Sequence, residues 1–125
     1  MIRKIVATAA PPPAGNYSQG IVASGEFLFI SGQTPRLADG TRLKGRPFSD
    51  DARQVMNNVK EIAEAAGFDL ATQCVKIVVY LTEWANKPEF DRVLAVYFPK
   101  TRPARTIVQS SFVDFSVELE AVLVR

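Results

Sequence analysis

The stretch 117–124, at the end of the chain, constrains the fold more than any other part of the sequence. Its residues alternate between two sets, and a period of two is typical of a β-strand whose two faces meet different surroundings. The first set is wholly apolar and consists of Val117, Leu119, Ala121 and Leu123. The second set mixes carboxylates with valines and consists of Glu118, Glu120, Val122 and Val124. The first face is therefore expected to lie in the core. The second is not polar throughout, as a solvated face would be, so we expect it to be covered as well.

Two segments carry the pattern of helices. The first begins at a cap formed by Ser49 or Asp50 and ends near Ala66. Its apolar positions recur every three or four residues, and they are Val55, Val59, Ile62 and Ala66. The second helix is expected at 89–98, because a proline suits its first turn and Pro99 stops it.

Short runs rich in β-branched and aromatic residues predict the strands. They lie at 2–7, 20–23, 27–33, 75–81, 105–110 and 117–124, with proline- and glycine-containing loops between several of them. This order predicts one α+β domain spanning 1–125, with a mostly antiparallel sheet and two helices on one of its faces. Because both helices are then used on the apolar face, another copy of the protein is the economical cover for the opposite face. A homo-oligomer is therefore expected.

The composition excludes several kinds of chemistry. The chain has no histidine, which removes histidine-based catalytic triads, histidine-ligated metal sites and zinc fingers. Fifteen Lys and Arg against thirteen Asp and Glu give a formal net charge of +2, so no nucleic-acid surface is expected. The single cysteine, Cys74, is interpreted as a buried core thiol, with a reactive thiol as the alternative. Neither a signal peptide nor a membrane span is indicated, so a soluble cytoplasmic protein is expected.

Four motifs occur in one order along the chain. They are Gly-Asn-Tyr-Ser-Gln-Gly at 15–20, Ser-Gly-Gln-Thr-Pro at 31–35, Arg-Pro-Ala-Arg-Thr-Ile-Val at 102–108 and Val-Glu-Leu-Glu-Ala at 117–121. Together they resemble the reactive-intermediate deaminase (RidA) family, also called the YjgF-type or endoribonuclease L-PSP family. The resemblance implies a chorismate-mutase-like fold and a homotrimer whose sheets form a central barrel, with clefts between subunits. It also implies hydrolysis of 2-aminoacrylate-type enamines and imines to a 2-keto acid and ammonia, without metal or organic cofactor.

Two residues are the candidates for catalysis. A guanidinium grips a carboxylate through two parallel hydrogen bonds, and in the family the position of Arg105 binds the substrate carboxylate. The alternative for Arg105 is an ion pair with Glu118 or Glu120. Imine hydrolysis also needs a group that aims water and moves protons, and the resemblance gives this role to Glu118. That match requires shortening the preceding loop by about two residues. Glu120 shares the strand face and is kept as a substitute, and an interface salt bridge is the alternative for either glutamate.

The resemblance assigns further residues to substrate binding. Tyr17 would line the cleft, although it could equally anchor its loop on the core. Ser31 and Gly32 would shape the pocket, with glycine permitting close approach of the backbone; the alternative for Ser31 is simply a small residue that ends a strand. The backbone N–H of Ile107 would be a further donor to the carboxylate.

The position of Lys87 departs from the family, which commonly has an aromatic residue there, contributed by a neighbouring subunit. A more basic rim would favour a longer or more acidic imino acid as the substrate. Other functions also remain open. They are a ring-cleavage-pathway deaminase of the 2-aminomuconate type, a non-catalytic module that binds keto acids, and a holdase-like chaperone. A ribonuclease is disfavoured by the missing histidine and the near-neutral charge.

Overall fold

The computed structural model describes residues 1–112 and 114–125. Its strands are β1 (Ile2–Ile5), β2 (Gly20–Ala23), β3 (Phe27–Gln33), β4 (Cys74–Leu81), β5 (Ala104–Gln109) and β6 (Val117–Val124). Its helices are α1 (Phe48–Ala65), α2 (Leu70–Gln73), the 3₁₀ turn η1 (Trp84–Asn86) and α3 (Lys87–Tyr97). The predicted strands and the two long helices are confirmed, with shifts of one or two residues at some ends.

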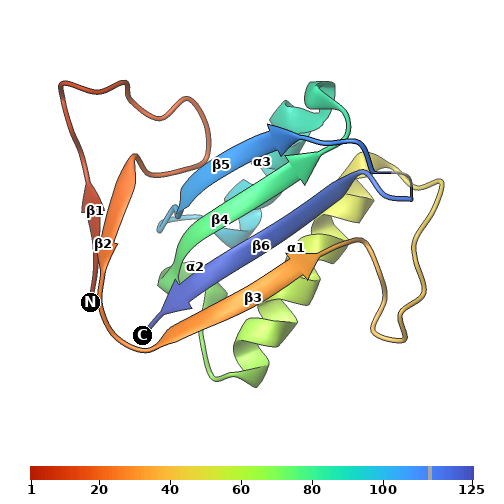
Figure 1. Ribbon diagram of the computed structural model, residues 1–125, viewed down its shortest axis with the longest axis horizontal. Helices are drawn as coiled ribbons and strands as arrows, with labels where there is room; N and C mark the ends of the chain where they lie inside the picture. The colour runs from red at the N-terminus through yellow and green to blue at the C-terminus, as the bar shows by residue number, and fades with distance from the viewer. Residues whose placement is uncertain (113) are drawn as a thin grey trace.

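The strands form two sheets (Figure 1). The main sheet has the order β3-β6-β4-β5, and β6 pairs antiparallel with both of its neighbours. β4 and β5 are parallel because α3 carries the chain back across the sheet between them. β1 and β2 pair with each other in a separate ribbon, so the turn at 24–26 passes the chain from one sheet to the other. The prediction of an α+β fold with a mostly antiparallel sheet and helices on one face is thereby confirmed.

The start and the buried stripe of α1 differ from the prediction. Pro47 occupies the N-cap position, so Ser49 and Asp50 lie inside the first turn instead of capping it. The buried residues of α1 are Asp51, Ala52, Val55, Met56, Val59 and Ala63. Ile62 and Ala66 are exposed, because the face that meets the sheet continues from Val59 through Ala63. The helix α2 was not predicted, since four residues are too few to show a periodicity.

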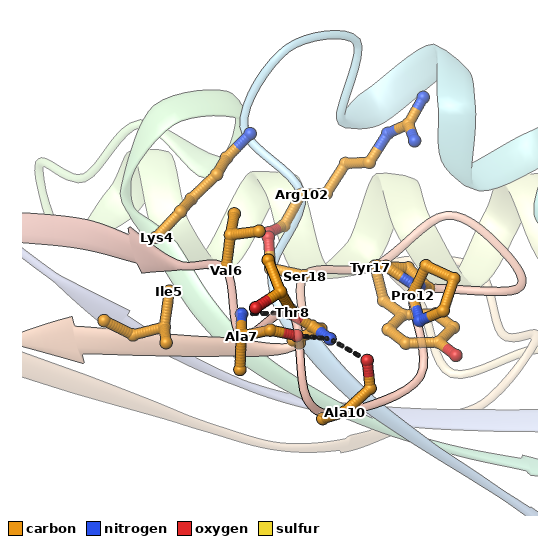
Figure 2. Close-up of a pocket in the computed structure, with 12 residues that line it drawn as sticks. Lys4, Ile5, Val6, Ala7, Thr8, Ala10, Pro12, Tyr17, Ser18 and Arg102 are labelled. Carbon is orange, nitrogen blue, oxygen red and sulfur yellow. Dashed lines mark hydrogen bonds between the residues drawn. The ribbon is translucent and has the colours of Figure 1, made fainter.

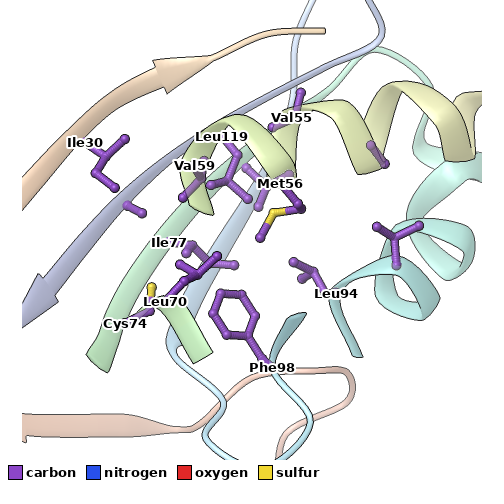
Figure 3. Packing of buried hydrophobic residues seen from close by; sticks show 14 of the residues in the cluster. Ile30, Val55, Met56, Val59, Leu70, Cys74, Ile77, Leu94, Phe98 and Leu119 are labelled. Carbon is purple, nitrogen blue, oxygen red and sulfur yellow. The ribbon is translucent and has the colours of Figure 1, made fainter. Parts of the chain in front are cut away.

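The core lies between the helices and the main sheet (Figure 3). The predicted inward face of β6 is confirmed, because Val117, Leu119, Ala121 and Leu123 are all buried. Val124 is buried as well, although its position in the alternation places it with the outward set. Cys74 is a core thiol as expected: it is 1% exposed, and burial raises its pKa to about 12.

We call the face of the main sheet opposite the helices the open face. Phe27 and Phe29 lie exposed on it, with their ring centroids 6.0 Å apart, and Glu120 is exposed beside them on β6. Apolar rings next to a carboxylate are consistent with a face that another copy covers, and the homotrimer stays a prediction. Within residues 1–112 and 114–125, no helix is both long and apolar enough to cross a membrane.

Candidate functional site

Arg105 lies on β5, the edge strand of the main sheet, opposite Ile77 of β4. Because Ile77 points into the core, Arg105 points to the helix side of the sheet, where its side chain is only 2% exposed. There its Nη1 donates a hydrogen bond to Oδ1 of Asp91, on α3. The ion pair considered as the alternative for Arg105 is therefore present, and within one copy of the chain its partner is Asp91, not Glu118 or Glu120. Those glutamates point to the other face of the sheet.

The loop before β2 covers the guanidinium of Arg105. The ring of Tyr17 stacks against it, with the guanidinium carbon 4.8 Å from the ring centroid. The Tyr17 hydroxyl accepts a hydrogen bond from the backbone N–H of Ala14 at 3.0 Å, which holds the ring within its own loop. A Cβ added to Gly15 would lie 2.7 Å from Nη2 of Arg105, so a side chain at this position would displace the guanidinium from where it stands. Tyr17 thus serves as a loop anchor and also contacts the arginine.

The same loop borders a cavity of about 440 Å³ (Figure 2). Gln19, which is part of the cavity lining, holds the loop together through hydrogen bonds. Its side-chain oxygen accepts from the backbone N–H of Ala7 at 2.7 Å, and its amide donates to the carbonyl of Pro11 at 2.6 Å. The cavity lies between β1 and the loop, and most of its lining is apolar. Tyr17 borders the cavity and stacks on Arg105 as well, so the Gln19 contacts also fix the wall of the arginine site.

Lys87, at the first position of α3, forms an ion pair with the same aspartate. Its Nζ lies 3.8 Å from Oδ2 of Asp91, one helical turn further along. Asp91 therefore stands between two cations, one at each carboxylate oxygen. The lysine is 28% exposed and lies beside a carboxylate, and the basic rim expected from Lys87 stays a prediction.

On the open face, Glu118 lies against an irregularity in β3. The register of β3 on β6 shifts between Ile30 and Gln33, which leaves Ser31 and Gly32 outside the regular ladder. A Cβ added to Gly32 would lie 3.0 Å from Cδ of Glu118 and 3.2 Å from its Cγ. The absence of a side chain at Gly32 is thus what allows the carboxyl group to rest on the backbone. Ser31 is exposed next to Gly32, so the structure brings these three residues together, and their roles in substrate binding and catalysis stay predictions.

Glu120 has a different environment, because the hydroxyl of Tyr80 on β4 donates a hydrogen bond to it at 2.9 Å. This bond favours the neutral phenol and raises the pKa of Tyr80 above its usual value, with burial and the charges of Glu120 and Glu118 acting in the same direction. Tyr80 therefore remains a proton-bearing donor next to two carboxylates. Sequence reasoning did not single out Tyr80, although its place in the alternation of β4 puts it on the same face as the glutamates.

Arg105 and Glu118 are separated within one copy of the chain. On β4 their partners are Ile77 and Tyr80, three residues apart, and the two strands flank β4 on opposite sides. This corresponds to roughly 10 Å along the strands and roughly 10 Å across them, with the side chains on opposite faces. Ile107 shares the edge strand and the face of Arg105, and its side chain packs on the core. Among residues 1–112 and 114–125, no group of three or more His, Cys, Asp or Glu is arranged to hold a metal ion.

The fold and these residues define a class, namely small α+β proteins with a buried arginine on an edge strand and a carboxylate on the open face of the sheet. Residues 7–124 match the family model described as Endoribonuclease L-PSP, so the chain belongs to that family, as the motifs indicated. A RutC family protein of Pyrococcus horikoshii is 42% identical over 116 residues, covering 90% of each chain. The 2-iminobutanoate/2-iminopropanoate deaminase of Bos taurus is 33% identical, covering 100% of this chain and 92% of its own. The crystal structure of E. coli TdcF with bound serine superposes with a TM-score of 0.72 at 31% identity, covering 98% of both chains.

Proposed function

We propose that this protein hydrolyses imines and enamines that carry a carboxylate, releasing a 2-keto acid and ammonia. The observation that carries the proposal is a buried arginine held by one aspartate, in a family that includes a relative named as an imine deaminase. The structure of TdcF with serine, a small amino acid with a carboxylate, supports the same substrate class.

Arg105 would bind the substrate carboxylate. A guanidinium has five N–H donors, and the hydrogen bond to Asp91 uses one of them, which leaves donors for a second carboxylate. In a site that is 2% exposed, such an ion pair is much stronger than at the surface. Because the loop with Gly15 and Tyr17 covers the guanidinium, substrate entry requires this loop to shift outward.

Glu118 would activate the water. Its carboxylate rests against Gly32, whereas Glu120 already accepts the hydrogen bond of Tyr80, and this contrast favours Glu118 over Glu120. As Glu118 removes a proton, the water oxygen bonds to the imine carbon and the C=N electron pair moves to nitrogen. The proton passes from Glu118 to nitrogen, which completes the tetrahedral intermediate. Glu118 then takes the proton of the new hydroxyl group and delivers it to the same nitrogen, so that the C–N bond breaks and ammonia leaves as the keto group forms.

Two copies of the chain would build the site together. Arg105 and Glu118 of one copy point to opposite faces, so a substrate that touches both needs the edge strand β5 of one copy beside the open face of another. The exposed rings of Phe27 and Phe29 give the open face an apolar surface for that contact. A homotrimer with clefts between subunits satisfies this arrangement.

The test is ammonia release from imines generated in place by an amino-acid oxidase. Glu118→Gln should abolish turnover and leave keto-acid binding intact, whereas Arg105→Lys, which keeps the charge opposite Asp91, should weaken both. Wild-type turnover in Glu118→Gln would refute the catalytic role of this glutamate. Binding of keto acids without any turnover in the wild type would favour the non-catalytic binding module instead.

A mixing experiment tests the shared site. The Glu118→Gln and Arg105→Lys variants, unfolded and refolded together, should be more active than either variant alone, because some clefts then pair a normal Arg105 with a normal Glu118. Each variant refolded alone is the control. Mixed assemblies that stay inactive, with mixing verified by mass, would show that the site does not span two copies.

A further inference from the structure

Asp91 occupies a position that the family motifs did not point to. One of its carboxylate oxygens accepts from Arg105, and the other lies 3.8 Å from Nζ of Lys87. Its side chain is 22% exposed, against 2% for Arg105, so water screens this part of the network weakly. Two cations and one anion at this point leave a single net positive charge.

The guanidinium is held from several directions. Asp91 accepts a hydrogen bond from Nη1 of Arg105, and the ring of Tyr17 lies against the flat face of the guanidinium. A Cβ at Gly15 would meet Nη2 of Arg105 at 2.7 Å and Oδ2 of Asp91 at 3.0 Å, so the loop backbone packs onto the ion pair itself. Of these contacts, only the hydrogen bond to Asp91 is directional. It occupies Nη1 and so determines which N–H groups of the guanidinium remain available for a substrate carboxylate.

We propose that Asp91 is the positioning residue for Arg105 and that it sets the charge of the site for a single carboxylate. The inference rests on the proposed function, because it needs Arg105 to bind the substrate carboxylate. One monocarboxylate neutralises the network of Lys87, Asp91 and Arg105, whereas a dicarboxylate adds an unbalanced negative charge in a weakly screened place. The site therefore selects imino acids with one carboxylate, in contrast to the more acidic substrate that Lys87 suggested.

The test compares two keto acids of equal length by titration calorimetry, 2-oxopentanoate and 2-oxoglutarate, which differ by a terminal carboxylate. The wild type should bind 2-oxopentanoate more tightly. Asp91→Asn keeps the acceptor oxygen and the size but removes the charge, and it should shift the preference toward 2-oxoglutarate on the order of tenfold. Asp91→Ala, which also removes the acceptor, should weaken the binding of both keto acids.

Two further variants make the result specific. Glu89→Gln is the matched control, because it removes one negative charge from the same helix, where Glu89 pairs with Arg92 at the surface. It should leave the preference unchanged. Lys87→Met should lower the affinity for 2-oxoglutarate more than for 2-oxopentanoate, and because Lys87 is partly exposed it tests the charge balance even if a substitution at Asp91 impairs folding.

The outcomes separate this inference from the proposed function. If Arg105→Lys weakens keto-acid binding as expected but the Asp91 and Lys87 variants keep the wild-type preference, only the role of Asp91 is refuted. An equal change in affinity for both keto acids in Asp91→Asn also refutes it, since a merely structural aspartate would act in that way. If the wild type binds neither keto acid, the proposed function fails and this inference fails with it.

Discussion

Replacing Gly32 by alanine should impair turnover without impairing folding. The new Cβ would lie 3.0 Å from Cδ of Glu118 and 3.2 Å from its Cγ. Oε1 of Glu118 would come closer still, and because non-bonded atoms pack best at about 3.5–4.0 Å, the carboxyl group has to move by roughly 1 Å. The neighbour that moves is the end of a flexible side chain, and the carboxylate position is therefore what changes.

The magnitudes follow from these distances. Misplacing a reacting group by about 1 Å can cost about 100-fold in rate, so kcat/KM should fall by about 10- to 100-fold. Gly32 does not adopt a positive φ, so alanine fits the backbone there. Alanine should raise the free energy of unfolding by up to about 1 kcal/mol, because it lowers the conformational entropy of the unfolded chain. This gain should roughly offset the cost of displacing the Glu118 side chain. Binding of a keto acid at Arg105 should stay within about twofold, because that step does not use Glu118.

The assay is ammonia release from in-place imines, combined with a urea unfolding curve for the same preparations. Gly20→Ala is the matched control, because its Cβ would meet only Cβ of Ile5, at an ordinary 3.7 Å. It should keep wild-type activity. The reasoning is refuted if Gly32→Ala retains full kcat/KM while Glu118→Gln loses it, since Gly32 would then have no part in placing the carboxylate.

Three other predictions concern groups outside the catalytic step. Burial raises the pKa of Asp51, and the hydrogen bond from Ser116 offsets this rise only in part. A carboxyl group whose pKa is raised by folding destabilises the folded state once it ionises, so the contribution of Asp51 to stability falls as the pH rises above its pKa in the unfolded chain, about 3.9. Asp51→Asn should therefore stabilise the protein more at neutral pH than near pH 4 in urea unfolding, and an equal effect at both would contradict this. Cys74, with a pKa of about 12 and 1% exposure, should not react with a disulfide reagent at neutral pH until the protein unfolds. The hydrogen bond to Glu120 raises the pKa of Tyr80, so Tyr80 should ionise above pH ~10. In an ultraviolet absorbance titration, Tyr80→Phe should therefore remove one tyrosine that ionises in this range. An unchanged titration would refute the assignment.

Much of the fold was predictable because strand and helix patterns are local. The alternation in 117–124 identified the buried face of β6 correctly, since neighbouring side chains of a strand point to opposite faces whatever the rest of the chain does. The stripe of α1 was only partly right, because the limits of a buried face depend on how a helix is rotated against the sheet. Ile62 illustrates this: it has the right spacing after Val59 and yet lies at the exposed border.

The candidate site was predictable only in part. The motifs identified Arg105 and Glu118 as candidates. The spacing of Lys87 and Asp91, one helical turn apart, also indicates from the sequence that they can form an ion pair on α3. No pattern indicated that Asp91 would meet Arg105, because that contact exists only once α3 packs beside the edge strand. The difference between Glu118 and Glu120 likewise depends on the tertiary structure, because both lie between β3 and β4 and only their contacts with Gly32 and Tyr80 distinguish them.

The sequence by itself determined which residues carry charge or apolar surface, where the strands and the long helices run, and which side of β6 enters the core. Only the tertiary structure decided that Asp91 holds Arg105, that Gly32 makes room for Glu118 and that Tyr80 binds Glu120. It also placed Arg105 and Glu118 on opposite faces of one sheet. The physical reason is that periodicity is a property of neighbours along the chain, whereas partners are determined by strand order, register and helix packing.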